Sequence, residues 1–369
     1  MIRILQCVNN MHRAGLETML MNYYRQIDRS RIQFDFLTHR PERSDYDDEI
    51  ERLGGRVYYA PRLYPQHYAA YFSFMKNFFR EHPEYQIVHS HIDAMSYLPL
   101  RAAKKAGVPI RIAHSHSTSI DRDFKYPLKQ LFRKRMLHVA NHCCACGDEA
   151  GKFLFGRHDF TLIPNAIDAA RFAYDAALRR DVRADLALED RLVIGHVGRF
   201  SYPKNHLYLL EIFAQIRKLR PDAALMLVGT GEKEQEIRTR ADEMSLTEHI
   251  RFMGSRDDVH RLYQAMDAFV MPSLFEGVPL TGVEAQFAQL PCIFSDKVPD
   301  EVAFTPLCRF VPLAESPAVW AAQVLDAISP ERGRLELAGA KYDIRCAHER
   351  LTDYYLHLLD TIDERKSPT

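Results

Sequence analysis

The sequence predicts an α/β protein with two domains, each built on a mostly parallel β-sheet. At 369 residues the chain is too long for one ordinary core and suits about two domains of ~150–200 residues each. Short runs of β-forming residues alternate with helical patterns in both halves, and such alternation forms βαβ units with parallel strands. The alternation lapses once, after Asn165, so we expect a domain boundary there.

The first half, residues 1–165, is predicted to form the first domain. Its strands are expected at Ile2–Val8, Ile32–Thr38, Arg56–Ala60, Gln86–His91, Ile110–His116 and His142–Cys146. Its helices are expected near Glu17–Ile27, Asp47–Leu53, Ala69–His82, Met95–Ala106 and Leu128–Ala140.

A polar, alanine-rich stretch, 166–190, is predicted to be an interdomain linker, and the second domain is predicted to cover 191–345. Its strands are expected at Leu192–Val197, Ala224–Val228, Ile250–Met253, Ala268–Met271, Cys292–Ser295 and Arg309–Val311. Its helices are expected near Asn205–Leu219, Lys233–Met244, Val259–Ala265, Val283–Ala288 and Pro317–Ile328. A last helix is expected at Ala347–Ile362.

Composition and charge argue against several classes of protein. The 49 basic and 49 acidic side chains cancel, which argues against a globally basic nucleic-acid-binding protein. The odd number of seven cysteines, three of them clustered at Cys143, Cys144 and Cys146, suits reduced thiols in the cytosol. The start of the chain lacks the apolar centre of a signal peptide, and no stretch reaches the ~20 apolar residues of a membrane span. We therefore expect a cytoplasmic protein, either soluble or peripheral to the membrane.

The stretch Pro272–Pro291 carries two carboxylates, and its pattern predicts a strand end, a turn and a short helix. Pro279 lies between Glu276 and Glu284, so the two glutamates cannot share one uninterrupted helix. Thr281 and Glu284 fit a capping box, which is a structural explanation for Glu284. Glu276 stands at the mouth of a strand, where α/β sheets bind ligands against helix N-termini.

Arg199 and Lys204 flank a predicted strand-to-helix turn in the segment Val197–Asn205. Two fixed cations and a helix N-terminus would then converge where a diphosphate could bind. Because most Lys and Arg side chains are solvated, the alternative is an ordinary surface pair.

These motifs, the Glu-x7-Glu of Glu276 and Glu284 and the G-R-x4-K that contains Arg199 and Lys204, resemble the signature of the retaining family 4 glycosyltransferases, of the kind found in bacterial exopolysaccharide and capsule biosynthesis. The resemblance implies the GT-B fold, in which two Rossmann-like domains face each other and a C-terminal helix, here 346–369, crosses back to the first domain. It implies that Glu276 contacts the donor sugar and that Glu284 holds the ribose of the nucleotide. Arg199 and Lys204 would neutralise the departing nucleoside diphosphate.

Further loops resemble segments of the family. The resemblance places the Gly-x-Gly loop that contains Gly229 near the nucleotide, and it implies that Ser255 and Arg256 contact the base, although an ordinary turn explains these two residues equally well. Gly15 ends a loop that could wrap an anion, but Ala14 stands where the family usually has a second glycine. The resemblance also assigns to donor binding Gly277, Val278, Pro279 and Leu280.

Two His-x-His pairs lie on predicted strands, and the side chains of each pair share one face because side chains alternate along a strand. Four imidazoles could form a zinc site, although no acidic residue is fixed beside them to support it. The resemblance instead implies that His116 faces the donor sugar and the acceptor. The other three would then line the same cleft or belong to the core: His89, His91 and His114.

Two acidic pairs, Asp45-x-Asp47 and Asp121-x-Asp123, have the spacing of the metal-diphosphate motif of the other glycosyltransferase fold. Acids just before a helix are the expected N-terminal charge arrangement, so we interpret both pairs as structural. The two cations of the second domain already do what such a metal would do. We therefore expect neither a divalent metal nor a cofactor.

A predicted helix of the first domain carries a basic row at four-residue spacing, Lys125, Lys129 and Arg133. Such a row suits an anionic bilayer or a lipid diphosphate, with each cation contributing ~1 kcal/mol, although a charge row is more often a solvated face. An opposing apolar stripe is expected to pack on the first domain: Leu128, Leu131, Phe132, Met136 and Val139.

The sequence therefore predicts a retaining glycosyltransferase that moves a sugar from a nucleotide-sugar donor to a hydroxyl of a saccharide acceptor. Uridine diphosphate is the commonest donor nucleotide in the family, and related enzymes often use a lipid-linked acceptor at the inner face of the membrane. Two alternatives share the site: a sugar-nucleotide epimerase of the same fold, and a catalytically silent nucleotide-sugar-binding protein. A nucleic acid is not expected as a partner.

Overall fold

The computed structural model describes residues 1–120, 123–328, 332–333, 335, 337 and 341–366. It divides the chain into two compact units. The first comprises Met1–Ala166 and Lys341–Thr369, and the second comprises Ile167–Ala340. The chain therefore leaves the first unit, forms the second and returns to the first.

The first unit is built on a seven-stranded parallel sheet. Its strands are β1 (Ile2–Cys7), β2 (Ile32–Thr38), β3 (Val57–Tyr59), β4 (Ile87–Ser90), β5 (Ile110–Ser115), β6 (His142–Ala145) and β7 (Thr161–Leu162). Their order in the sheet is β3-β2-β1-β4-β5-β6-β7. All the predicted strands of this unit are confirmed, but β7 is too short to leave a pattern in the sequence.

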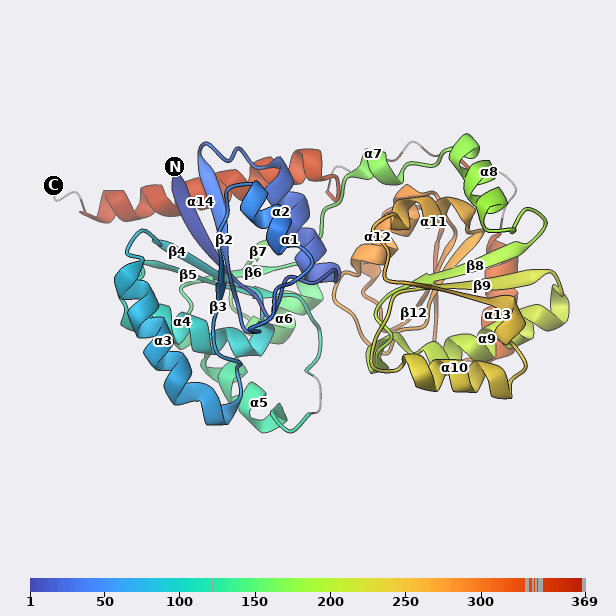
Figure 1. The fold of residues 1–369 in the computed structure, drawn as a ribbon, viewed down its shortest axis with the longest axis horizontal. Coiled ribbons are helices and arrows are strands. Elements are labelled where there is room, and N and C mark those ends of the chain that lie inside the picture. The colour runs from blue at the N-terminus through green and yellow to red at the C-terminus, as the bar shows by residue number, and fades with distance from the viewer. Residues whose placement is uncertain (121–122, 329–331, 334, 336, 338–340, 367–369) are drawn as a thin grey trace. The chain divides into compact units, whose positions relative to one another are not determined.

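Helices cover both faces of the first sheet. They are α1 (Gly15–Gln26), α2 (Asp47–Arg52), α3 (Tyr68–Glu81), α4 (Tyr97–Lys105), α5 (Tyr126–Arg135), α6 (Asp148–Phe155) and α14 (Ile344–Lys366). α1, α2 and α14 share one hydrophobic core with the strands, and α3 to α6 share another (Figure 1). Ile4 and Leu5, neighbours on β1, belong to different cores because successive side chains of a strand point to opposite faces.

The last helix, α14, belongs to the first unit although it follows the second in sequence. The predicted helix Ala347–Ile362 is confirmed and is longer at both ends. Neither α14 nor any other described helix is long and apolar enough to cross a membrane. Apolar side chains at helical spacing pack into the core that also contains α1: Ile344, Ala347, Leu351, Tyr355 and Leu358.

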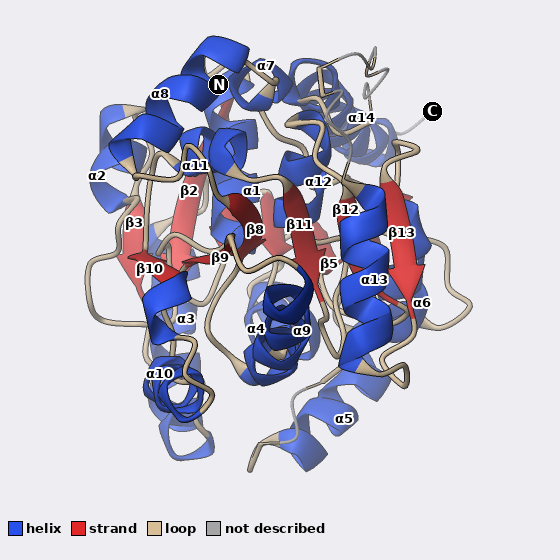
Figure 2. Ribbon diagram, turned by 90° about the vertical axis from the view of Figure 1, so that its right-hand side faces the viewer, coloured by secondary structure: helices blue, strands red, loops and turns tan. Residues whose placement is uncertain are grey.

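The second unit contains a six-stranded parallel sheet. Its strands are β8 (Leu192–Val197), β9 (Ala223–Val228), β10 (Ile250–Gly254), β11 (Ala268–Met271), β12 (Cys292–Ser295) and β13 (Cys308–Val311). Their order is β10-β9-β8-β11-β12-β13, and Figure 2 shows β11, β12 and β13 side by side. All the predicted strands of this unit are confirmed.

The predicted helices of the second unit are also present. They are α9 (His206–Leu219), α10 (Glu234–Glu243), α11 (Val259–Ala265), α12 (Leu280–Phe287) and α13 (Pro317–Ala327). α9, α10 and α13 contribute Phe213, Ile237 and Trp320 to one buried core with the sheet.

The stretch 166–190, predicted as a linker, instead contains two helices of the second unit, α7 (Ala169–Phe172) and α8 (Ala176–Asp185). The carboxylate of Asp175 caps α8 by accepting hydrogen bonds from N–H groups of its first turn. Arg183 is buried and donates to the carbonyl of Ala265 at 2.7 Å. Because this helix is anchored by polar side chains rather than by an apolar stripe, its sequence resembles that of a linker.

The basic helix predicted at Leu128–Ala140 is present as α5 followed by a short 3₁₀ turn. Phe132, Met136 and Val139 are buried as expected. Leu131 is 42% exposed, so its assignment to the apolar stripe is wrong. At 3.6 residues per turn, Leu131 lies about a quarter-turn from the centre of the stripe, which leaves it on the solvent side.

Each sheet has one place where the strand order reverses: between β1 and β4 in the first unit, and between β8 and β11 in the second. In open α/β sheets, ligands bind outside the carboxyl ends of the strands at such a switch point. The loops after these strands are therefore the first places to look for a functional site in each unit.

Candidate active site

At the switch point of the second sheet, backbone hydrogen bonds hold three loops side by side. The N–H of Gly198 donates to the carbonyl of Val228 at 3.0 Å, which joins the loops after β8 and β9. The N–H of Leu274 donates to the carbonyl of Pro203 at 2.7 Å, which joins the loops after β8 and β11. The three loops therefore form one connected surface of the second unit.

Two glycines permit this close approach. A Cβ at Gly229, whose φ is +136°, would lie 2.1 Å from the carbonyl oxygen of Gly198. A Cβ at Gly231 would lie 2.3 Å from the carbonyl oxygen of Phe200. Any larger residue would push the loops apart, so Gly229, which the family resemblance assigns to donor binding, also has a structural reason to be glycine.

Lys204 and Glu276 form an ion pair that bridges the loops after β8 and β11. Nζ of Lys204 lies 2.6 Å from Oε1 of Glu276, and the two side chains are only 17% and 13% exposed. The side-chain amide of Asn205 donates to the carbonyl of Pro272 at 3.1 Å and ties the same two loops together. Two residues that the sequence predicts for the site are thus in direct contact.

Two buried histidines near Lys204 were not anticipated from the sequence. His196 is the fifth residue of β8 and His206 is the first residue of α9, and their ring centroids are 4.7 Å apart. Burial lowers the pKa of His196 to about 4 and that of His206 to about 2, and the charge of Lys204 contributes to both shifts. Both rings are therefore neutral at pH 7, and the positive charge beside them is that of Lys204.

Arg199 has a different setting from Lys204. Its guanidinium lies 3.0 Å from a carboxylate oxygen of Glu232, and the side chains are 68% and 54% exposed. The two cations therefore have separate carboxylate partners, and Arg199 is not held as rigidly as the sequence analysis expected.

Glu284 is not part of a capping box, contrary to the prediction. α12 begins at Leu280 with Pro279 as its N-cap, so Thr281 is already inside the helix. The carboxylate of Glu284 instead accepts a hydrogen bond of 2.9 Å from the hydroxyl of Tyr263. Burial raises the pKa of Glu284 to about 7, while the Tyr263 hydroxyl opposes that rise.

The remaining predicted donor-binding positions of the second unit lie in two segments, the turn after Glu276 and the loop after β10. Gly277 is half-buried, while Val278, Pro279 and Leu280 are buried where the turn enters α12. Ser255 and Arg256 follow β10 and are exposed. Nε and Nη2 of Arg256 donate hydrogen bonds to the carboxylate of Asp258 at 2.7 and 2.6 Å, so this arginine has a local structural partner.

Gly15, the predicted anion-loop residue, is the exposed first residue of α1. A Cβ there would meet nothing within 4 Å, so the fold does not require glycine at this position. The carboxylate of Asp45 already accepts a hydrogen bond of 3.1 Å from the N–H of Arg13 in the same loop. An anion at this loop would therefore meet the negative charge of Asp45.

The described residues of the two acidic pairs have hydrogen-bond partners within the first unit. Asp47 accepts hydrogen bonds from the N–H of Ser44 at 2.9 Å and from the hydroxyl of Tyr59 at 2.6 Å. Asp123 accepts one from Lys129 at 3.0 Å. Asp121 lies outside the described residues.

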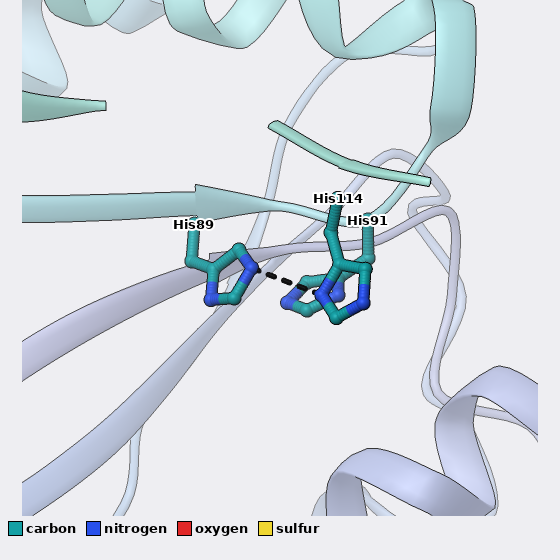
Figure 3. Close-up of side chains that lie close together, drawn as sticks. All are labelled: His89, His91 and His114. Atoms are coloured by element: carbon teal, nitrogen blue, oxygen red, sulfur yellow. Dashed lines mark hydrogen bonds between the residues drawn. The ribbon is translucent and has the colours of Figure 1, made fainter. Parts of the chain in front are cut away.

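Four histidines form a compact cluster in the first unit, where β4 and β5 end. Figure 3 shows His89, His91 and His114, and His116 directly follows β5. Nε2 of His89 lies 3.1 Å from Nδ1 of His114, and Nδ1 of His91 lies 3.0 Å from Nε2 of His116. Burial lowers the pKa of His116 to about 3 and the pKa values of the other three well below 6.5. All four rings are therefore neutral at pH 7.

Three of these histidines meet the distance requirement of a metal site. Ring nitrogens of His89, His91 and His114 lie within 4.8 Å of one another, and neutral imidazoles are common zinc ligands. However, the cluster is joined by two imidazole–imidazole hydrogen bonds, which a metal would have to replace. The rings are thus bonded to one another without any ion.

Models of two protein families match the two halves of the chain. "Glycosyltransferase Family 4" matches residues 13–171, and "Glycosyl transferases group 1" matches residues 179–303. EpsF of Bacillus subtilis (strain 168), a glycosyltransferase by name, is 38% identical over 344 residues, which cover 90% of each chain. The chain belongs to glycosyltransferase family 4. The resemblance drawn from the glutamate and Arg–Lys motifs is thereby confirmed, and this family 4 protein is a glycosyltransferase.

Two further comparisons agree. The Escherichia coli UDP-Gal:alpha-D-GlcNAc-diphosphoundecaprenol alpha-1,3-galactosyltransferase is 30% identical over 227 residues, or 58% of each chain. The crystal structure of Anabaena HepE in complex with UDP and glucose has a TM-score of 0.80 at 16% identity, covering 96% of this chain and 99% of that one. The family 4 protein therefore has the GT-B fold, with two Rossmann-like parallel-sheet units, as predicted.

Proposed function

We propose that this family 4 enzyme is a retaining glycosyltransferase that acts in bacterial surface polysaccharide synthesis. It transfers a sugar from a UDP-sugar donor to a hydroxyl of a lipid-linked saccharide at the cytoplasmic side of the membrane. It needs no divalent metal and no cofactor. The observation that carries the proposal is the Lys204–Glu276 ion pair at the switch point of the second sheet.

In this proposal Lys204 balances the charge that develops on the leaving diphosphate, and Glu276 binds the hydroxyls of the transferred sugar. Burial supports both roles, because a charge held in a partly dry site stabilises a transition state more than the same charge in water. Arg199 adds a second cation by turning from Glu232 to the phosphates. The leaving phosphate helps to deprotonate the acceptor on the same face of the sugar, so no covalent nucleophile is needed.

The nucleotide is assigned to the loops beside the ion pair. Glu284 holds the ribose, and Ser255 and Arg256 contact the base. The turn that follows Glu276, from Gly277 to Leu280, is assigned to the donor together with the Gly229 loop. Gly15 remains a candidate phosphate contact, and His116 is assigned to the sugar and the acceptor.

The names of two similar proteins support the choice of substrates. The Escherichia coli relative is named for a UDP-Gal donor and a diphosphoundecaprenol-linked acceptor. The HepE structure contains UDP and glucose. UDP is therefore the first nucleotide to test, and a polyprenyl-diphosphate saccharide is the first acceptor.

A turnover assay tests the reaction. Purified enzyme is incubated with a set of UDP-sugars and a polyprenyl-diphosphate saccharide, with and without EDTA, and the anomeric configuration of the product is read by NMR. A product of retained configuration that forms equally well in EDTA supports the proposal. An inverted product or complete dependence on metal contradicts it. An epimer formed without acceptor would identify an epimerase, and tight donor binding without turnover would identify a binding protein.

We assign the proposed membrane contact to the outer face of α5, formed by Leu131, Lys134 and Arg135, rather than to the predicted row of Lys125, Lys129 and Arg133. Lys129 already bonds Asp123, and the guanidinium of Arg133 lies over the ring of Phe153 at 4.3 Å. Residues three and four apart on the helix share another face that is exposed and combines one leucine with two cations: Leu131, Lys134 and Arg135. Exposed cations beside an apolar side chain suit an anionic bilayer.

Vesicle sedimentation tests this contact. The enzyme is expected to bind vesicles of anionic lipid at low salt and to leave them at high salt. Changing Leu131 to Ser, with Lys134 and Arg135 to Ala, should abolish binding, whereas changing Lys125, Lys129 and Arg133 to Ala should weaken it less. Absence of binding at low salt, or equal effects of the two triple variants, would remove this outer face from the proposal.

A further inference from the structure

Gln6 joins the histidine cluster at His91, and its amide oxygen sets the proton positions on His91 and His116. Oε1 of Gln6 lies 2.8 Å from Nε2 of His91, and Nε2 of Gln6 lies 3.3 Å from the hydroxyl of Tyr355. Gln6 lies on β1 and Tyr355 on α14, and both side chains are buried. An amide oxygen only accepts hydrogen bonds, so Nε2 of His91 carries the proton and donates it.

That proton fixes the tautomers of His91 and then of His116. A neutral imidazole carries one N–H, so Nδ1 of His91 holds a lone pair. This nitrogen lies 3.0 Å from Nε2 of His116, which must therefore be the protonated nitrogen of that ring. His116 is left with its lone pair on Nδ1.

The path from Gln6 through His91 to His116 is one arm of the network. The other arm runs from Gln6 through Tyr355 to His89 and His114, and it ends differently. The hydroxyl of Tyr355 lies 2.7 Å from Nδ1 of His89, and Nε2 of His89 lies 3.1 Å from Nδ1 of His114. Nε2 of His114 is buried and has no hydrogen-bond partner among the described residues. One arm thus stops inside the protein at His114, while the other reaches His116, which is partly exposed.

We propose that Gln6 and His91 are positioning residues that hold His116 as its Nε2–H tautomer, so that Nδ1 accepts a hydrogen bond from a substrate hydroxyl. The backbone of His116 is also held, because its N–H donates to the carboxylate of Asp93 at 2.8 Å. This inference rests on the proposed function, which supplies hydroxyls from the donor sugar and the acceptor. In that role His116 orients a hydroxyl and does not act as a general acid.

Long-range ¹H–¹⁵N NMR of the full-length enzyme with ¹⁵N-labelled histidine tests the tautomer directly. The His116 signals are assigned by their loss in His116→Ala. Wild type is expected to show a protonated Nε2 and an unprotonated Nδ1 at His116. A protonated Nδ1 in wild type would overturn the proposal, because it would mean that the amide of Gln6 is turned around and every proton of this arm lies on the opposite nitrogen.

Variants of Gln6 separate positioning from mere packing. Gln6→Leu removes the acceptor of His91 and should give a mixture of His116 tautomers with a kcat about tenfold lower, the lower end of the range for losing a residue that orients a site ligand. Gln6→Glu keeps an acceptor oxygen and should restore both the tautomer and most of kcat. If both variants fold and lose kcat equally with an unchanged His116 tautomer, Gln6 has only a packing role and the proposal fails.

Tyr355→Phe is the matched control, because it removes the hydroxyl that contacts His89 and Nε2 of Gln6 but leaves Oε1 of Gln6 facing His91. It should leave the His116 tautomer unchanged and change kcat by less than about twofold, and a shift of the His116 tautomer in this variant would contradict the separation of the arms. Metal analysis and titration with Zn²⁺ complete the test. Stoichiometric binding that moves the ring ¹⁵N signals would make the cluster a metal site and would overturn the proposed positioning of His116. The tautomer is measured without turnover. Failure of the tautomer prediction can therefore be distinguished from failure of the proposed transferase reaction.

Discussion

The switch points of the two sheets have the same topology but opposite chemistry. In the second unit, the loops after β8 and β11 hold Lys204 and Glu276 as a partly buried ion pair. In the first unit, the ends of β4 and β5 hold four imidazoles that are neutral at pH 7. In the proposed function, the ammonium of Lys204 faces a diphosphate and the neutral rings face sugar hydroxyls. On these proposed roles, the side chains at the strand ends, and not the shared fold, would decide what each unit binds.

Loss of the fixed cation should have the largest effect. Lys204→Ala is expected to lower kcat about 10²–10³-fold, since it removes a preorganised charge at the leaving group. Lys233→Ala is the control, because Lys233 is an exposed lysine of the same unit that pairs with Glu236. Turnover of the purified, folded variants with donor and acceptor gives the comparison. Wild-type turnover in Lys204→Ala would show that the second unit does not work through this charge.

Glu284 should make the second unit less stable as pH rises. Its pKa is raised from 4.5 to about 7, so the folded state holds the proton more tightly than the unfolded chain. Its stabilising contribution is therefore complete below pH 4.5 and is lost as pH rises through about 7. At about 1.4 kcal/mol per pKa unit, the free energy of unfolding should change by about 3 kcal/mol relative to Glu284→Gln.

Urea unfolding at several pH values measures this effect through the single tryptophan, Trp320, which is buried in the second unit. The exposed Glu232 supplies the control variant, Glu232→Gln, which should show no comparable trend. A difference between wild type and Glu284→Gln that is the same at every pH would mean that burial does not shift this carboxyl group.

The histidine cluster should respond to pH in the opposite direction. Burial holds the pKa values of His89, His91 and His114 well below 6.5, so the unfolded chain binds protons more readily than the folded state. The stability from these groups is complete above about pH 6.5 and is lost on acidification. Hydrogen exchange at β4 and β5, corrected for intrinsic rates, should be about tenfold or more faster at pH 5 than at pH 7. Equal protection at both pH values would contradict the buried neutral cluster.

Loss of Glu276 should affect binding of the UDP-sugar but not binding of UDP alone. Glu276→Ala is expected to weaken binding of the UDP-sugar about tenfold while leaving the affinity for UDP nearly unchanged, because the carboxylate is assigned to the sugar. Glu284→Ala should weaken both ligands, because the ribose is common to them. Calorimetry with UDP and with the UDP-sugar distinguishes these patterns, and an equal loss for UDP in both variants would disprove the division of roles.

Arg199 should matter least among the charged residues of the site. Its exposure and its pairing with Glu232 predict a loss of about tenfold in kcat for Arg199→Ala, at the low end of the range for a charge partner. Arg199→Lys should recover part of it, and Arg238→Ala, an exposed arginine paired with Glu234, is the control. A loss as large as that of Lys204→Ala would show that Arg199 becomes fixed when the donor binds.

The sequence alone determined the alternating architecture of both units and the resemblance to family 4. All the strands predicted from their apolar runs are present, because such runs bounded by loops specify buried parallel strands through local propensity and burial. Local pattern also placed Lys204 and Glu276 in loops that follow predicted strands. It was misleading where helices are held by polar side chains, as in α8, and where a cap depends on the start of the helix, as at Thr281.

Only the tertiary structure decided which side chains pair. Lys204 meets Glu276 across 72 positions of the chain, and Gln6 meets Tyr355 across 349. No local pattern encodes such contacts, because they depend on strand order and on the return of α14 to the first unit. The tertiary structure also sets the protonation states, since the pKa of an imidazole or a carboxyl group depends on its burial and on nearby charges. The sequence therefore identified most of the candidate groups, and the packing gave them their partners and their charges.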